Sequence, residues 1–537
     1  MKNRYWSIVE NDIPRFLAQL DGNPISPTFG SFDRSFWHHR RTDFSSAALQ
    51  QGVFALALLY SDNYDRNLFY QKPHVLTWIE ASLKFTFRIQ HQDGSMDEWY
   101  PQERGWAGPT GYVLYSVIQT LELVGQKLDS NLIKQAKIFA EKAVHHLLNY
   151  EESDVLANHQ AMAILATRAA KKYFNIPSSQ NEVKNWRRFS ASFSDEGWSL
   201  EYDGCDPGYQ TATLSFLSRL YQIDPSEKIK ELCEGQLKFL SLFLFPDNSF
   251  AGSMGSRGTT NVFHFGFEYW AKSNDLASHL AEQTLCGIEA GILLRPCDQE
   301  DHYLIYRLVE FLESARIEQP KQVLPWAQPL GNHYYNVSSI FKIHTKDFYG
   351  LLNLNKNGAG RIIRLSDSKV IFEDSGYFFE DSAGLRYSSS FVQKNRKILF
   401  EENKLVLEGS FNVYRRPVFS QFSFWLFRTA LLFVHNSTFS RLLKIWIRAK
   451  IMTKFSTTEK IYIRREITFA PSLKIIDTIQ TSGVEIKKAY RAFYFPTRSV
   501  PQSLYFSKRM IAEPTGIMLS SEVDELNLNK KIELVVV

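Results

Sequence analysis

Five polar loops in the N-terminal half of the chain carry side chains that could bind and act on a sugar. Aromatic rings can stack on sugar rings, while Asn, Arg, His, Tyr and carboxylate groups can hydrogen-bond hydroxyls or transfer protons. The loops read FDRSFWHHRRTDF, DGSMDEWYPQERGW, ANHQAM, EYDGCDPGYQT and GSMGSRGTTNVFHFGFE. Our candidate residues within them are His39, Glu98, Trp99, Tyr100, Arg104, Trp106, Asn158, His159, Tyr209, Arg257 and His264.

The segments between these loops have the periodicity of helices. Up to about residue 316, apolar residues recur at three- and four-residue spacing, which predicts helices. The predicted helices cover residues 47–60, 75–87, 111–123, 131–148, 159–173, 211–221, 229–245, 276–293 and 303–312. Helices in antiparallel succession favour a ring of helical hairpins. Loops at one end of such a ring converge on a central cleft, where their polar and aromatic groups would form a sugar site.

The pattern changes in the C-terminal half. From about residue 329, segments such as YYNVSSIFKIHT and NKLVLEGSFNVYR alternate apolar with polar residues and are rich in β-branched and aromatic types, which predicts strands. Many strands with short turns indicate a large antiparallel β-sandwich. We therefore expect an all-α toroid domain over residues 1–317, a Pro-containing linker over 318–330 and a β-sandwich domain over 331–537.

Composition and charge exclude several classes of protein. The longest apolar stretches, such as Val53 to Leu59, are too short to span a bilayer. The N-terminus lacks the apolar run of a signal peptide, so we expect a cytoplasmic protein. The cysteine spacing indicates no metal site, nothing requires a cofactor, and no zinc-finger, RNP-like or P-loop motif indicates nucleic acid or nucleotide binding. Residues 1–320 carry a net charge of −9 and residues 321–537 one of +14, and a basic half can attract an anionic glycan.

The order of two motifs resembles a known family. Asn158 and His159 open a predicted helix, DPGYQT with Tyr209 follows 51 residues after Asn158, and an all-α domain precedes a β-sandwich. This combination resembles the heparinase II/III-like polysaccharide lyases and their alginate lyase relatives. The resemblance implies an incomplete helical (α/α) toroid joined to an antiparallel β-sandwich. It also implies cleavage of a uronic-acid-containing poly- or oligosaccharide by β-elimination.

β-Elimination makes chemical demands that the family's residues would meet. The enzyme must neutralise the uronate carboxylate, remove the C5 proton and protonate the leaving O4. By the family pattern, Asn158, together with His159, would bind the carboxylate, and Tyr209 would act as base, acid or both. A tyrosine near its usual pKa of about 10 is a poor base, so a cation would have to lower that pKa. Arg104 or Arg257 could supply the cation.

The other candidates would bind substrate or supply a further histidine. Trp99 and Trp106 could stack on sugar rings. Family lyases generally have another catalytic histidine, and many carry an H-x-H-x-D-like stretch early in the β-domain that this chain lacks. His264 is a candidate for that role, and His333 and His344 are alternatives. The candidate substrate-binding set is His39, Glu98, Trp99, Tyr100, Arg104, Trp106 and Arg257.

Two other functions remain open from the sequence. A glycoside hydrolase on the same toroid would need two carboxylates about 5–10 Å apart. A non-catalytic glycan-binding factor in surface polysaccharide biosynthesis could keep the fold and lose the acid and base groups, and the missing H-x-H-x-D-like stretch favours it. The carboxylates available to a hydrolase are those of Asp43, Asp97, Glu98, Asp206 and Glu268.

Overall fold

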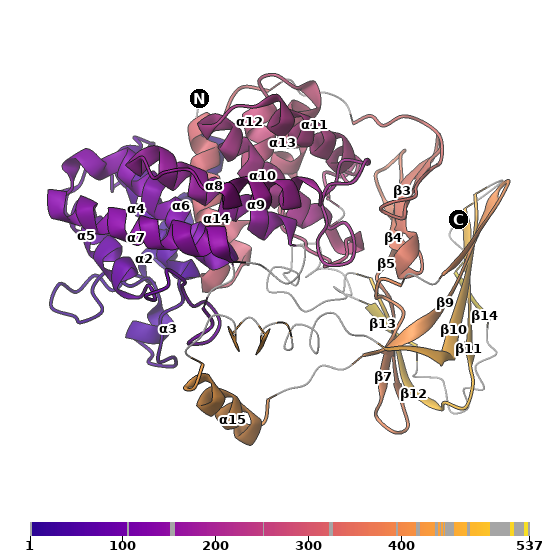
Figure 1. The fold of residues 1–537 in the computed structure, drawn as a ribbon. Coiled ribbons are helices and arrows are strands. Elements are labelled where there is room, and N and C mark those ends of the chain that lie inside the picture. Colours follow the sequence, from indigo (N-terminus) through magenta and orange to yellow (C-terminus); the bar gives the residue numbers. More distant parts are fainter. Residues whose placement is uncertain are drawn as a thin grey trace.

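Helices fill the N-terminal half of the chain and antiparallel strands fill the C-terminal half, which confirms the predicted fold class (Figure 1). The computed structural model describes most of the chain. The described ranges are residues 3–104, 107–150, 156–250, 252–321, 326–393, 396–414, 419–434, 439–440, 442–443, 445, 456–469, 473–493, 516–519 and 531–534.

A ring of helices forms the inner layer of the N-terminal domain. Each inner helix contacts the next one around the ring, and the last helix, α14, also contacts α4, which joins the two ends of the ring. The inner helices are α4 (Gly52–Ser61), α6 (Ala107–Val124), α8 (Ala157–Phe174), α10 (Pro207–Ile223), α12 (Phe265–Trp270) and α14 (Asp301–Ile317).

A second layer of helices covers the outside of this ring. Each outer helix follows an inner helix in the chain and packs against it as a hairpin. The hairpin toroid predicted from the three- and four-residue spacing is therefore present. The outer helices are α5 (Pro73–Arg88), α7 (Ser130–Asn149), α9 (Gln180–Ser190), α11 (Glu227–Ser241) and α13 (Asp275–Glu289). The short helices α1 (Arg4–Val9) and α2 (Ile13–Leu17) pack against α14, and α3 (Arg34–Trp37) forms one turn before α4.

The two layers differ in sequence because they differ in burial. The inner helix α4, GVFALALLYS, is apolar on all sides and is buried from Gly52 to Tyr60, as expected of a helix surrounded by others. The outer helix α7 has one apolar face, which includes Phe139 and Ala143, and this face packs into the core. Asp129 fixes the start of α7, because its carboxylate accepts hydrogen bonds from two N–H groups of the first turn.

Two antiparallel sheets form the described part of the C-terminal domain. The first is a meander in the order β1 to β5, and the second has the order β13-β12-β6-β7-β9-β10-β11-β14, with β8 paired to β9. The first sheet contains β1 (His333–Tyr335), β2 (Ile340–His344), β3 (Phe348–Asn353), β4 (Ala359–Arg364) and β5 (Val370–Asp374). The second contains β6 (Gly376–Asp381), β7 (Arg386–Ser388), β8 (Lys397–Glu401), β9 (Lys404–Tyr414), β10 (Ser456–Thr468), β11 (Lys474–Thr481), β12 (Ile486–Ala492), β13 (Gly516–Met518) and β14 (Lys531–Leu534).

The first sheet lies between the helices and the second sheet. Along β3 and β4, Leu351 and Ile363 join the core of the helical domain, whereas Leu352 and Ile362 join a core shared with the second sheet. Neighbouring residues therefore point to opposite faces, as the pleat of a strand requires. The sandwich predicted from the alternating segments is confirmed, and it is continuous with the helical core.

Contacts between the two domains also fix the loop that carries Arg257. The Nζ of Lys356 donates to the carbonyl of Gly255 at 3.0 Å, and Nδ2 of Asn353 donates to the carbonyl of Met254 at 2.7 Å. Both donor side chains are buried. The first sheet thus holds the backbone on the N-terminal side of Arg257 against the helical domain.

A buried network of charges joins strands of the second sheet to β5. The guanidinium of Arg465 bonds to Asp374 at 2.7 Å and to Asp477 at 2.6 Å, and Arg491 bonds to Asp374 at 3.0 Å. The Tyr377 hydroxyl donates to Asp477 at 2.6 Å. Burial alone would raise the pKa of Asp374, but the two arginines outweigh it and hold that pKa below its usual range.

Removal of Arg465 should destabilise the protein strongly. We expect Arg465→Met to lower the free energy of unfolding by about 3–5 kcal/mol, because two buried carboxylates lose their main cation. The measurement is chemical unfolding of the full chain followed by circular dichroism.

The neighbouring arginine provides a matched control. Arg464 points to the other face of β10, where its side chain is 40% exposed and bonds to Glu408 and Glu466. Arg464→Met should cost less than about 1 kcal/mol, because exposed ion pairs contribute little. Equal losses in the two variants would show that the buried network does not stabilise the sandwich.

Candidate active site

The buried carboxylate of Glu201 joins two of the predicted site residues. Its Oε1 accepts hydrogen bonds from the backbone N–H of Asn158 at 2.9 Å and from Nδ2 of Asn158 at 2.7 Å. Its Oε2 bonds to Nη1 of Arg257 at 3.2 Å. Leu156, just before α8, forms an antiparallel bridge with Glu201. Chain segments far apart in sequence therefore meet at one carboxylate.

Glu201 also fixes the direction of the Asn158 side chain. The amide nitrogen must face Glu201, because the flipped amide would place two acceptor oxygens against each other. The Oδ1 of Asn158 then points elsewhere, and it is buried with no hydrogen-bond partner among the described residues. An unsatisfied buried acceptor costs about 1–3 kcal/mol, so it marks a place where a ligand can supply the missing donor.

Asp206 brings Tyr209 and Arg257 together. It caps α10, because its Oδ1 accepts from the N–H of Tyr209 at 3.1 Å. Its Oδ2 accepts from the N–H groups of Arg257 at 2.9 Å and Thr259 at 3.3 Å. Pro207 at the first helical position has no N–H to satisfy and suits this start. The cap therefore sets the helix and the Arg257 loop side by side.

The guanidinium of Arg257 lies over the ring of Tyr209, at 3.8 Å from the ring centroid. Burial raises the pKa of Tyr209, and the charge of Arg257 opposes this only in part, so the pKa stays above its usual value. The sequence led us to expect a cation that lowers this pKa below 10. Arg257 lies where such a cation should be, but full burial outweighs it, and the phenol is neutral at physiological pH.

Three other predicted residues line a cleft of about 500 Å³. His39, Glu98 and Trp99 contribute to its walls. The Trp99 ring stacks on His302 with centroids 4.8 Å apart, and Nε2 of His302 lies 3.4 Å from Oε1 of Glu98. The cleft also contains Arg34. Aromatic faces beside polar groups are typical of sugar sites.

Two arginines lie in the wall of the cleft. Arg34 and Arg41 form no ion pair with any described residue. Desolvation, Arg41, His38 and Arg34 lower the pKa of His39, which is the response of an imidazole to neighbouring cations. The wall also carries carboxylates, those of Asp33, Glu98, Glu300 and Asp301. The two arginines are therefore local positive charges in a cleft of mixed charge.

Two buried tyrosines lie near both the cleft and the Glu201 group. The hydroxyl of Tyr306 donates to that of Tyr112 at 2.8 Å. Burial raises the pKa of Tyr112, and so do Tyr209, Glu98 and Glu201. Tyr112 is therefore within electrostatic range of Glu98, in the cleft wall, and of the Glu201 group.

Acidic side chains shape the loop that carries Glu98 and Trp99. Glu103 is buried, and its Oε2 accepts from the N–H groups of Glu98 and Trp99, both at 2.9 Å. Asp97 likewise accepts from two backbone N–H groups of this loop. Arg104 lies 3.7 Å from Asp93 and does not line the cleft. Asp97 therefore has a structural role.

Two further predicted residues lie apart from the cleft walls. Tyr100 makes an edge-on contact with Phe427, with ring centroids 5.3 Å apart, and so faces α15 (Gln421–Leu431). Trp106 lies outside the described residues.

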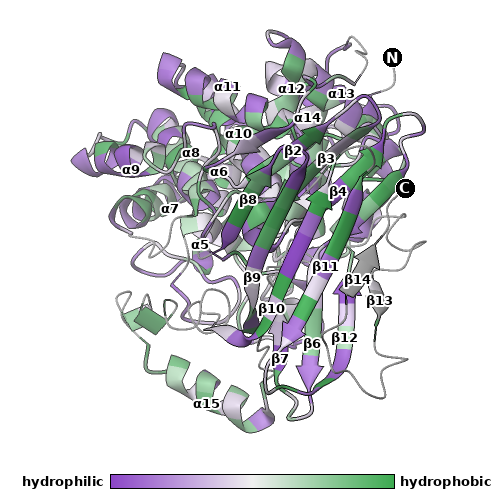
Figure 2. Cartoon of the chain, turned by 90° about the vertical axis from the view of Figure 1, so that its right-hand side faces the viewer, coloured by the Kyte–Doolittle hydropathy of each residue, from purple (hydrophilic) through white to green (hydrophobic). Residues whose placement is uncertain are grey.

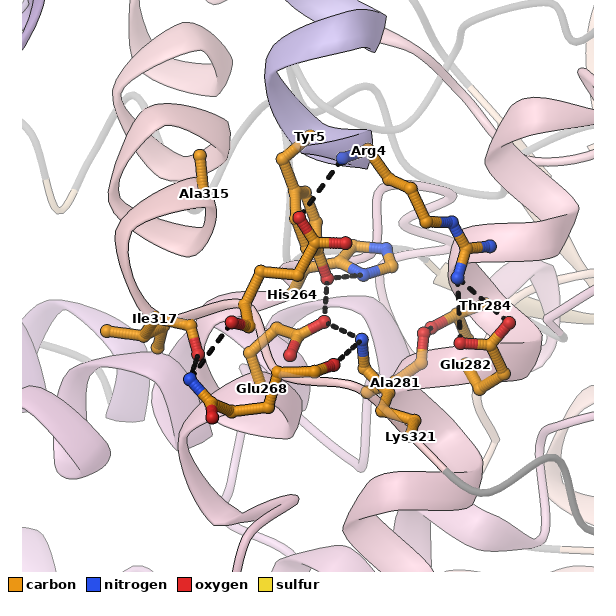
Figure 3. Close-up of polar contacts among 12 residues, drawn as sticks. Arg4, Tyr5, His264, Glu268, Ala281, Glu282, Thr284, Ala315, Ile317 and Lys321 are labelled. Carbon is orange, nitrogen blue, oxygen red and sulfur yellow. Dashed lines mark hydrogen bonds and ion pairs between the residues drawn. The ribbon is translucent and has the colours of Figure 1, made fainter. Parts of the chain in front are cut away.

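The structure places His264 in a separate buried cluster (Figure 3). The hydroxyl of Tyr5 lies 3.4 Å from Nδ1 of His264 and donates to Glu268 at 2.6 Å, and Lys321 bonds to Glu268 at 2.6 Å. Burial and the charge of Arg307 lower the pKa of His264 well below its usual value. This cluster ties α1 to α12 and to the end of the helical domain. No described contact joins it to the Glu201 group.

The two alternative histidines are part of the first sheet. His344 bonds through Nδ1 to the carbonyl of Pro329 at 2.9 Å. His333 is exposed on β1 and contacts Tyr335. Neither lines the cleft. Among the described residues, no group of three or more His, Cys, Asp or Glu is placed to bind a metal ion.

The carboxylates proposed for a hydrolase are mostly occupied elsewhere. Asp97 and Asp206 accept backbone N–H groups, Glu268 belongs to the His264 cluster, and Asp43 pairs with Arg428. Of the five candidates, Glu98 lines the cleft.

Sequence reasoning missed the residues that hold this site together. They are Glu201, Tyr112, His302 and Tyr306. Glu201 lies inside the EYDGCDPGYQT loop, but its partner Asn158 is 43 residues away, and no spacing rule joins them. His302 follows a polar run at the start of α14. Such a run marks a helix end, and this was the sequence signal that could have indicated a residue of the cleft.

A second cavity lies on the outside of the helical ring. Its volume is about 250 Å³, and its walls include Leu147, Ile164 and Trp186. It contains none of the predicted site residues. The larger cleft, which contains His39, Glu98 and Trp99, is therefore the better candidate for a glycan site.

Comparison with solved structures identifies the fold. No protein-family model and no curated protein matches the sequence. The chondroitin AC lyase of Streptomyces coelicolor A3, in complex with chondroitin sulphate, is 8% identical and aligns over 91% of this chain and 68% of the lyase, with a TM-score of 0.52. A Paenibacillus xanthan lyase is 8% identical over 91% and 46%, with a TM-score of 0.48. A heparan sulfate lyase of Pedobacter heparinus is 10% identical over 83% and 62%, with a TM-score of 0.33. On the first of these alignments, the chain shares the fold of that chondroitin AC lyase.

Proposed function

We propose that the protein is a polysaccharide lyase that cleaves a uronic-acid-containing poly- or oligosaccharide by β-elimination. One observation carries the proposal: Asn158, Arg257 and Tyr209 are held together by the buried carboxylates Glu201 and Asp206. Their side chains supply a hydrogen-bonding amide, a cation and a neutral phenol. These are groups that β-elimination at a uronate needs.

The first task is to neutralise the uronate carboxylate. The unpaired Oδ1 of Asn158 can accept a hydrogen bond from the protonated carboxyl group. Arg257 adds positive charge beside it. Both effects stabilise the enolate-like charge that develops when C5 loses its proton. Because Glu201 fixes the direction of both side chains, little reorganisation is needed when substrate binds.

The second task is proton transfer. In the proposed reaction a base takes the C5 proton, the C5–H electrons form the C4–C5 double bond, and the C4–O4 bond breaks. Tyr209 then donates its proton to O4. The raised pKa of Tyr209 favours this acid role, because the phenol carries its proton when substrate arrives.

His159 is our proposed base. It follows Asn158 in the first turn of α8 and is half-buried. It lies close enough to Glu201 to affect the pKa of that carboxyl group, so it belongs to the same group. Its ring lies close to Gly108, where an added Cβ would be 3.2 Å away. Histidine is the side chain that most readily gains and loses a proton near neutral pH.

The cleft would bind the glycan on either side of the scissile bond. Trp99 offers a partly exposed ring for stacking, and His39, Arg34 and Arg41 supply positive charge. A uronate carries one negative charge, which Arg34 or Arg41, neither of them in an ion pair with a described residue, could bind.

Loss of the Tyr209 hydroxyl should abolish eliminative cleavage. We expect Tyr209→Phe to reduce the rate on the order of 10²–10⁴-fold, because general acid catalysis is lost while the ring still packs under Arg257. The measurement is ultraviolet absorbance of the unsaturated uronate, during incubation with a panel of uronate-containing glycans. Tyr173→Phe, at the far end of α8, is the matched control and should retain activity.

The same assay separates the rival functions. New reducing ends without ultraviolet absorbance would indicate a hydrolase. Full activity in Tyr209→Phe would contradict the proposed acid.

The cations of the cleft should act on binding rather than on chemistry. We expect Arg41→Ala to raise KM for the anionic glycan by roughly tenfold, the equivalent of about 1.4 kcal/mol, with little change in kcat. The effect should shrink at high salt, because salt screens the charge. Steady-state kinetics at two ionic strengths tests this.

A surface arginine away from the cleft serves as control. Arg66 is exposed and pairs with Glu10, and Arg66→Ala should leave KM unchanged. If Arg41→Ala lowers kcat and leaves KM unchanged, the proposed role of the cleft is wrong.

A further inference from the structure

The segment that runs from α3 towards α4 forms part of the cleft wall and is closed on itself. The N–H of Arg41 donates to the carbonyl of Ser35 at 2.9 Å. The N–H of Ser46 donates to the carboxylate of Asp33 at 2.8 Å. Arg34 lies between these two acceptor residues in the chain. The bonds therefore hold the start of the segment, with Arg34, beside its end.

Three polar groups of this segment have no hydrogen-bond partner among the described residues. They are Nε of Arg34, the hydroxyl of Thr42 and the hydroxyl of Ser46, and all three atoms are buried. All three residues line the cleft, and Ser46 is only 6% exposed. Buried polar groups are nearly always hydrogen-bonded, so three such groups in one wall mark a place where a ligand can bind.

The carboxylates of the same segment already have partners. Asp33 accepts hydrogen bonds from backbone N–H groups, and Asp43 pairs with Arg428. Arg34 and Arg41 form no ion pair with any described residue. A guanidinium can only donate hydrogen bonds, and a hydroxyl can donate one. The matching ligand group must therefore supply several acceptor atoms and a negative charge.

We propose that Arg34, Thr42 and Ser46 form a subsite for a sulfate ester on the glycan. This inference rests on the proposed function for the class of ligand, because it places the sulfate on a uronic-acid-containing glycan in the cleft. A sulfate ester has three terminal oxygens that accept hydrogen bonds, one for each of the unpartnered groups. Hydrogen bonds to a charged acceptor are the strong ones. Arg41 then remains available to the carboxylate of a neighbouring uronate.

Charge and the rest of the site favour a sulfate over other anions. The carboxylate of the uronate that reacts is assigned to Asn158 and Arg257, so this subsite would bind a second anionic group, on a neighbouring sugar. The cleft wall also carries Glu300 and Asp301. A phosphate brings nearly two negative charges at neutral pH, which these carboxylates would repel, whereas a sulfate ester brings one.

Cations on the outer sheet are a poorer match for a sulfated glycan. Figure 2 shows β9, β10 and β11 side by side, with hydrophilic residues between hydrophobic ones. On these strands Lys404 bonds to Glu466, and Arg464 bonds to both Glu408 and Glu466. Because carboxylates already compensate these cations, they attract an anion less than Arg34 does.

Equilibrium binding of matched glycans tests the proposal. The probes are size-matched oligosaccharides of alginate and of hyaluronan, each in its unsulfated and its chemically sulfated form. The full-length protein carries Tyr209→Phe, so that the glycans are not cleaved during the measurement. We expect the sulfated form of at least one glycan to bind about tenfold more tightly than its unsulfated form. The measurement is isothermal titration calorimetry at constant ionic strength.

Two variants that remove a single hydroxyl test the residues. Ser46→Ala and Thr42→Val should each lower the affinity for the sulfated glycan by about tenfold, because one hydrogen bond to a charged group is lost. Neither should change the affinity for the unsulfated glycan. Ser45→Ala is the matched control, since the Ser45 hydroxyl accepts from Gln50 and Ser45 does not line the cleft. It should bind both forms as before.

Equal affinities for the sulfated and unsulfated forms, or no binding of either, would overturn the proposal. So would an equal loss of both affinities in Ser46→Ala, because the subsite would then bind a group that both forms share, such as a carboxylate. These results do not depend on cleavage. A preference for sulfate in a protein that forms no unsaturated product would contradict the proposed function and support this subsite.

Discussion

The candidate site depends on one buried carboxylate that has no access to solvent. Glu201 is fully buried, so its charge must be compensated by hydrogen bonds and a cation. Burial raises the pKa of Glu201, while Arg257 and the two N–H donors of Asn158 lower it. Loss of these partners would leave a buried charge without compensation, and the free-energy cost of that state holds them in place. The direction of the Asn158 amide and the position of Arg257 over Tyr209 both follow from that requirement.

The arrangement of the helices and of the first sheet also fixes the positions of the site residues. Asn158 and Tyr209 lie at the N-terminal ends of two inner helices, α8 and α10, which contact each other in the ring. Arg257 lies on a loop whose backbone is bonded by Asp206 from the helical side and, through Gly255, by Lys356 from the first sheet. The sandwich therefore contributes to the site, although no residue of its described strands lines the cleft.

The sequence could predict those parts of the structure that leave a periodic pattern of apolar residues. Helical spacing and the change to a period of two indicated the toroid and the sandwich, because both patterns reflect burial of one face. Asn158 and Tyr209 were found through a resemblance, not through spacing alone. We did not predict Glu201, because a buried carboxylate leaves no periodic signal in the sequence and its partners are distant in sequence. His264 was a reasonable candidate by residue type, yet it packs in a separate cluster with Tyr5. We did not predict α15 (Gln421–Leu431), because its apolar residues resemble those of a strand.

The reaction type can be tested most directly by mass spectrometry of the products. Elimination breaks the C4–O4 bond without adding water. The account therefore predicts an unsaturated product, lighter by one water molecule than its hydrolytic counterpart. A saturated product that has gained the mass of one water molecule per cleavage would contradict the account, because it would show that water, and not a double bond, completes the cleavage.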